Sequence, residues 1–125
     1  MLRSVKSTQR KIRQLELILK KEAGADLAAS GPASHQVKSV TDGSGVISIV
    51  LKQAFAGDVV VIGNSSEQNG RVRAKTDNGK GTTADPIKLI HMDASNPSTE
   101  ASAQALSDDE EITLLIIGSD VTEKY

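Results

Sequence analysis

The sequence predicts a mainly β protein, a small antiparallel β-sandwich or barrel with an N-terminal amphipathic α-helical arm. Three observations lead to this prediction. Short runs rich in Val and Ile recur in the second part of the chain, turns containing Gly and Asn separate them, and a basic segment with a helical repeat precedes them. A chain of 125 residues has room for one domain plus an arm. We divide it into an arm (1–24), a linker (25–36), a β domain (37–120) and a C-terminal tail (121–125).

The arm is predicted to be a helix from about Ser7 to Ala23. Seven basic and two acidic side chains give residues 1–22 a charge of +5, whereas the remaining residues carry −6. Charge asymmetry of this kind is typical of an interaction tail. A helix this short is marginal in water, so its apolar stripe is expected to need a partner surface. The stripe follows a three-four spacing through Val5, Thr8, Ile12, Leu15 and Leu19.

Residues 25–36 are rich in Ala, Ser, Gly and Pro, which is the composition of a linker, so the arm and the body are predicted to be separable. Beyond the linker the hydrophobic period becomes two, and turn residues such as Asp42-Gly43-Ser44-Gly45 separate the apolar runs. Six strands at this spacing indicate a sandwich or barrel. The predicted strands are Val37 to Thr41, Val46 to Leu51, Val59 to Ile62, Val72 to Lys75, Ile87 to Met92 and Ile112 to Ile117.

The sequence offers few groups for catalysis or metal binding. The chain has no Cys, and two histidines, His35 and His91, do not complete a metal shell by themselves. His91 falls inside a predicted strand and is interpreted as an ordinary strand-face histidine rather than as part of a Ser-His-carboxylate set. The acidic run 108–111 lacks the ligand spacing of a calcium loop and is interpreted as a solvated charge run. The GKGT string at 79–82 lacks the first glycine of a phosphate loop. We therefore expect no enzyme activity, no cofactor and no metal.

Aromatic residues make up only 2% of the chain, so the core is predicted to consist of Val, Ile, Leu and Ala. In such a domain, apolar burial at roughly 25 cal/mol per Å² and an ordering cost of about 1.5 kcal/mol per residue nearly cancel. Burying further surface between subunits would shift this balance toward the folded state. We therefore expect an oligomer.

Four segments of the β region carry a resemblance to a known family: DGSGVISIVLKQAF, VVVIGNSS, RVRAKTDNGKGTTADPIKLI and EEITLLIIGSD. Together they resemble small virion proteins of tailed bacteriophages, in particular the cement or decoration proteins on the outside of the capsid. The resemblance implies a homotrimer that is made in the host cytoplasm, binds the major capsid protein at the virion surface and stabilises the shell. The arm would then be an anchor whose contacts come from Arg10, Ile12, Arg13, Leu15 and Leu19.

Two other functions stay open. The first is a trimeric fibre or tail-associated receptor-binding domain, in which the helix forms a stalk and the loops contact the host. The second is a nucleic-acid-binding accessory protein, which the basic arm would suit, but the body is acidic and lacks the aromatic platform on which single-stranded bases stack. No small-molecule substrate is expected, and no membrane contact, since the apolar stripe lacks Trp or Phe anchors.

Overall fold

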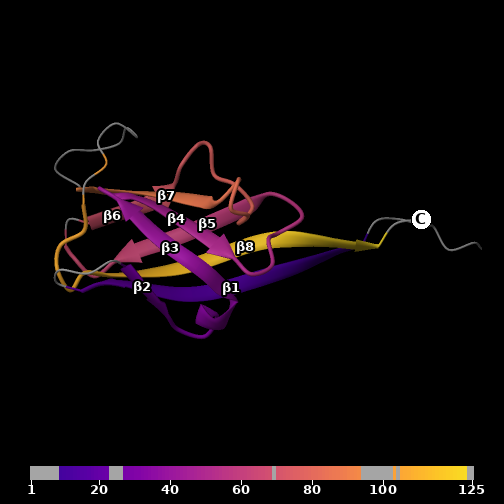
Figure 1. Ribbon diagram of the computed structural model, residues 1–125, viewed down its shortest axis with the longest axis horizontal. Coiled ribbons are helices and arrows are strands. Elements are labelled where there is room, and N and C mark those ends of the chain that lie inside the picture. Colours follow the sequence, from indigo (N-terminus) through magenta and orange to yellow (C-terminus); the bar gives the residue numbers. More distant parts are fainter. Residues whose placement is uncertain (1–8, 23–26, 69, 94–102, 104, 124–125) are drawn as a thin grey trace, which may run out of the picture.

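The computed structural model describes residues 9–22, 27–68, 70–93, 103 and 105–123, which form two four-stranded antiparallel sheets (Figure 1). Sheet A has the strand order β2-β1-β8-β5, and sheet B has the order β3-β4-β7-β6. A short 3-10 turn, η1 (Ser34–Gln36), precedes β3. No helix in the described part is long and apolar enough to cross a membrane. The strands are β1 (Gln9–Lys21), β2 (Leu27–Ser30), β3 (Val37–Gly43), β4 (Val46–Leu51), β5 (Val59–Ser65), β6 (Gly70–Ala74), β7 (Ile87–Asp93) and β8 (Glu111–Glu123).

The mainly β fold is confirmed, and each of the six runs predicted as strands overlaps one of the strands β3 to β8. In β4 the alternation is complete, because Ile47, Ile49 and Leu51 are buried and the residues between them are half-buried. The last strand is longer than predicted. Residues 121–123, interpreted as a tail, continue β8 and pair with β1 as far as Glu123.

The predicted N-terminal helix is wrong for the described residues, because Gln9–Lys21 is strand β1. It pairs with β8 from Gln9 opposite Glu123 to Lys20 opposite Glu111. Leu15 and Leu19 are four residues apart, which suits both a helical stripe and a strand that alternates. Leu17 distinguishes the two, since it is buried together with Leu15 and Leu19 while Gln14 and Glu16 are exposed. Pairing with the strongly apolar β8 decides the conformation against local helix propensity.

The predicted linker also needs correction over its described residues. Leu27–Ser30 forms β2, which pairs with β1, and Leu27 and Ala33 are buried in the core. Gly31 has a φ of +94°, a left-handed conformation that turns the chain back so that the Ala33 N–H donates to the Glu16 carbonyl at 3.0 Å. The described strands of the predicted arm and linker, β1 and β2, are therefore part of sheet A and contribute to its core.

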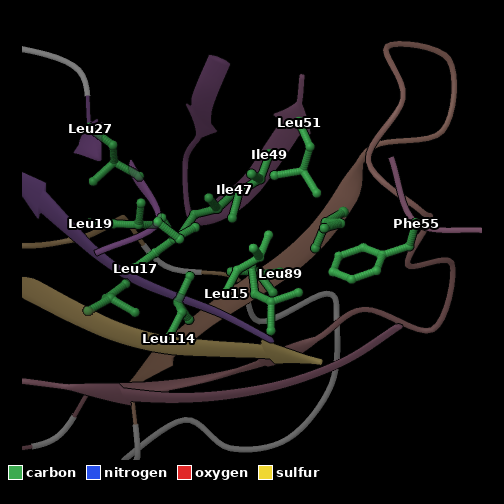
Figure 2. Packing of buried hydrophobic residues seen from close by; sticks show 14 of the residues in the cluster. Leu15, Leu17, Leu19, Leu27, Ile47, Ile49, Leu51, Phe55, Leu89 and Leu114 are labelled. Atoms are coloured by element: carbon green, nitrogen blue, oxygen red, sulfur yellow. The ribbon is translucent and has the colours of Figure 1, made fainter. Parts of the chain in front are cut away.

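The hydrophobic core lies between the two sheets and draws on both of them. Figure 2 shows the leucines of β1 and Leu114 of β8 meeting the isoleucines of β4 and Leu89 of β7. Phe55 closes one end of this cluster, and a Cβ at Gly118 of β8 would overlap its ring. The core is aliphatic, as the low aromatic content predicts.

β1 and β8 extend beyond the rest of the body as a two-stranded ribbon, residues 9–12 and 119–123 (Figure 1). β5 accompanies β8 only as far as Val59 opposite Gly118. At the base of the ribbon, the N–H groups of Ala56 and Gly57 donate to the Ser119 carbonyl at 3.1 and 2.9 Å. A two-stranded ribbon is marginally stable alone in water, so contact with another surface would stabilise this one.

Candidate functional site

The outer face of sheet A is the side turned away from sheet B. Residues paired across antiparallel strands point to the same side of the sheet, so the strand register defines the face. The register runs from β1 through β8 to β5 and places alternate residues of each strand outward. The face has four rows: Ile12 with Ser119; Gln14, Ile117 and Val60; Glu16, Leu115 and Ile62; and Ile18, Thr113 and Asn64.

Large apolar side chains are exposed on this face. Ile12, Val60 and Ile62 are 63%, 57% and 57% exposed, and Leu115 and Ile117 between them are half-buried. An antiparallel sheet commonly has one apolar face, on the core, and one polar face, in water. Sheet A has apolar residues on both faces. An exposed apolar patch of this kind is typical of an interaction surface.

Sheet B provides an internal comparison. On its outer side, one row crosses β3, β4 and β7 through Thr41, Ser48 and Lys88, all of them polar. The equivalent central rows of sheet A have a polar residue only on β1, where Gln14 and Glu16 lie beside aliphatic side chains of β8 and β5. The outward residues Val46 and Val50 of sheet B are half-buried, and among the described residues the large apolar side chains that are more than half exposed all lie on sheet A.

Two hollows lie on the outer face of sheet A. One, of about 350 Å³, has walls from Ile18, Pro32, Ile62 and Leu115. The other, of about 420 Å³, lies toward the ribbon, with Ile12, Val60 and Ile117 on the sheet and residues 56–58 at its side. Each hollow has the size to receive side chains of another protein surface. The outer face of sheet A, with its hollows, is our candidate functional site.

The structure separates the five residues predicted to contact a partner. Ile12 lies on the outer face of sheet A. Leu15 and Leu19 are fully buried in the core, which corrects their prediction as partner contacts, because the strand points them toward sheet B. Arg10 belongs to the ribbon and its backbone pairs with Val121, but its side chain is outside the described part of the structure.

Arg13, the fifth of these residues, points inward and holds the base of the ribbon together. Its guanidinium lies over the Phe55 ring, 4.2 Å from the centroid, and its Nε lies 3.1 Å from Asp120 Oδ2. Its Nη2 donates to the Gln53 carbonyl at 3.0 Å. The ion pair is largely shielded, with the Arg13 side chain 18% exposed. Arg13 therefore stabilises the base of the ribbon within the protomer.

A buried polar cluster joins β5, β7 and the loop before β8. Glu110 is 1% exposed, and its Oε2 accepts a hydrogen bond from Ser65 Oγ and lies 2.7 Å from His91 Nε2. Its Oε1 accepts the Ser107 N–H at 2.8 Å. The sequence interpretation of 108–111 as a solvated charge run is thus wrong for Glu110, which enters the body because these three partners replace its hydration.

This cluster contains a hydroxyl, a carboxyl and an imidazole, the groups of a nucleophilic triad, but in a different order. In such a triad the imidazole lies between the other two and takes the proton from the hydroxyl. Here the Glu110 carboxyl lies between Ser65 and His91. The arrangement ties the end of the loop to the sheets. Among the described residues, no three His, Cys, Asp or Glu side chains gather as a metal site.

Comparisons with protein-family models, with curated proteins and with solved structures find no match to this chain.

The loop that contains the GKGT string is closed on itself by hydrogen bonds. The N–H groups of Lys80, Gly81 and Thr82 all donate to the Asp85 carbonyl, at 2.9 to 3.2 Å. They are therefore not directed at an anion as the amides of a phosphate loop are.

Nearby, a hydrogen bond from Lys88 and the charge of Lys75 lower the pKa of Asp77 below its ordinary value of 3.8. Asp77 and the two lysines form an exposed ion-pair group.

Proposed function

We propose that this chain is a non-enzymatic virion protein that binds the outer surface of a tailed-phage capsid as a decoration protein and stabilises the shell. The segments that resemble this family support the proposal. They form β4, β5, β6, β7 and β8 together with their turns, so the resemblance extends over both sheets.

The outer face of sheet A is the observation on which the proposal rests. Three of its aliphatic side chains are more than half exposed, and they lie around the half-buried Leu115 and Ile117 of β8. Such a surface favours contact with another protein over contact with water. The apolar area that such a contact removes from water stabilises the complex by roughly 25 cal/mol per Å². A protein whose most distinctive surface is an apolar sheet face is suited to assembly. The Ser-His-carboxyl cluster around Glu110 is inside the body.

The proposed attachment to the capsid uses the ribbon in place of the predicted helical anchor. The ribbon of residues 9–12 and 119–123 extends from the body and contains the basic residues Arg10 and Lys11. We assign capsid contact to the end of the ribbon. Opposite charges on two surfaces speed their encounter and fix their register. The fibre alternative depended on a helical stalk, and over Gln9–Lys21 that segment is a strand.

Co-sedimentation with expanded capsids that lack this protein tests the proposal. We expect saturable binding in hundreds of copies per capsid and a higher temperature of capsid disruption. Arg10→Glu is expected to weaken binding about tenfold, roughly 1.4 kcal/mol, through charge reversal at the contact. Lys52→Glu, an exposed charge outside the ribbon, is the matched control and should bind as the unaltered protein does. No saturable binding, or only a few copies per particle, would contradict the capsid role.

A further inference from the structure

We infer that the outer face of sheet A packs against the same face of a second copy of this chain. The two copies are related by a two-fold axis that lies in the interface and crosses the strands at the row of Leu15, Ile116 and Val61. Such a contact is isologous, so each residue faces a defined position on the partner. The axis places β1, β8 and β5 each over its own copy, running in the opposite direction.

The residue pattern supports this particular axis. On each strand, positions equally far from the central row have similar chemistry, so the two copies present matching groups to each other. Aliphatic residues face aliphatic residues, and an amide faces a carboxyl. The facing pairs are Ile12 with Ile18, Gln14 with Glu16, Ile117 with Leu115, and Val60 with Ile62.

The electrostatics distinguish this axis from the other in-plane choice. With the two-fold axis across the strands, the Gln14 amide can donate to the carboxylate of the partner's Glu16. By symmetry, the partner's Gln14 donates to Glu16 of the first copy. An axis along β8 would place β1 over β5, and Glu16 would then lie against the partner's Ile62. Burying a carboxylate against an aliphatic side chain without a hydrogen bond is costly. The charge pattern therefore favours the crossing axis.

The shape of the face fits as well. Ile12, the most exposed large apolar residue of the described part, faces the partner's Ile18, which forms a wall of the 350 Å³ hollow. The exposed Ile12 of each copy is thus positioned to enter the hollow of the other. Stacked sheets lie about 10 Å apart with their strands about 30° from alignment, which keeps the central strand β8 in contact with its copy.

A second copy is the occupant that this self-matching pattern selects, since a capsid surface would require no symmetry within the face. The pairing predicts a dimer as the elementary assembly, whereas the family resemblance implies a trimer. It concerns the protein alone, so it is tested without capsids. Capsid contact is assigned to the end of the ribbon and the pairing to the outer face of sheet A, so co-sedimentation with capsids and the mass of the free protein report on the two proposals separately.

Sedimentation equilibrium of four proteins tests the pairing. The unaltered protein is expected at twice the 13.2 kDa protomer mass. Val60→Lys and Ile62→Glu should each fall to one protomer mass, because a charge then faces an aliphatic residue. The double variant Val60→Lys/Ile62→Glu should return to the dimer, since residue 60 faces residue 62 of the partner and the new charges are opposite. Both side chains are more than half exposed in the protomer, so these changes should leave the thermal unfolding of the protomer intact.

The control is Val46→Lys/Val50→Glu, which places the same charges on half-buried outward residues of sheet B and should stay dimeric. An unaltered protein that is monomeric or trimeric would overturn the inference. So would single variants that remain dimeric, because the contact would then lie elsewhere. A double variant that stays monomeric would overturn the proposed axis. A protein that is monomeric throughout and loses capsid binding in these variants would also overturn the inference. The outer face of sheet A would then be assigned to the capsid instead.

Discussion

Deletion of residues 1–24 is expected to abolish folding rather than to release an independent β body. The deletion removes β1, the partner of β8 along nearly its whole length, and three fully buried leucines. Truncation of one such Leu to Ala costs about 2–5 kcal/mol, and an average domain has only about 5–15 kcal/mol of stability. Far-UV circular dichroism and amide proton dispersion by NMR are the measurements. We expect the spectra of an unfolded chain.

Single substitutions make the same test without truncation. Leu17→Ala should lower the free energy of unfolding by about 2–5 kcal/mol, because it leaves a cavity between the sheets. Lys38→Ala, at an exposed position of β3, is the control and should change the free energy of unfolding by about 0.5 kcal/mol or less.

A truncated protein that keeps the thermal midpoint and sheet signal of the full chain would show that β1 is not part of the core.

Glu110→Ala is expected to destabilise the protein by about 3 kcal/mol. The change removes the acceptor of Ser65 Oγ and of the Ser107 N–H and takes the carboxyl away from the buried His91. Polar groups that lose a partner inside a protein are not rehydrated, so the cost exceeds that of an exposed hydrogen bond. Urea denaturation measures the effect as a lower midpoint with an unchanged slope.

Glu110→Gln should cost less than Glu110→Ala, because its carbonyl oxygen can still accept one hydrogen bond. Asp108→Ala, two residues away and exposed, is the control and should unfold near the midpoint of the unaltered protein. If Glu110→Ala and Asp108→Ala unfold at the same urea concentration, the buried cluster does not stabilise the loop.

The strands beyond residue 37 could be predicted because each one shows its own pattern. β4 alternates regularly, and glycine-containing turns separate β3 from β4. The sequence also contained an unused signal for the interaction surface. Val59–Ile62 and Leu114–Ile117 are uninterrupted apolar runs, and runs without alternation are typical of strands with apolar residues on both faces. Val60 and Ile62 could have been identified in this way.

β1 and the site residues it contains could not be predicted from local pattern alone. The spacing of Ile12, Leu15 and Leu19 is compatible with a helix, and the evidence for a strand comes from β8, about 100 residues away. The residues of β2 show no apolar pattern that predicts a strand, because Leu27 is its one large apolar residue. Glu110 lies in an acidic run, and its partners Ser65 and His91 are 45 and 19 residues distant. Such contacts are set by tertiary structure.

Strand β1 (residues 9–21) buries Leu15 and Leu19 and turns Ile12 toward the outer face of sheet A. Amide hydrogen exchange read residue by residue tests this assignment most directly. We expect the amides of Leu15, Leu17 and Leu19 to exchange as slowly as those of Ile112, Leu114 and Ile116 in β8. Fast exchange through residues 9–21, beside slow exchange in β8, would contradict it.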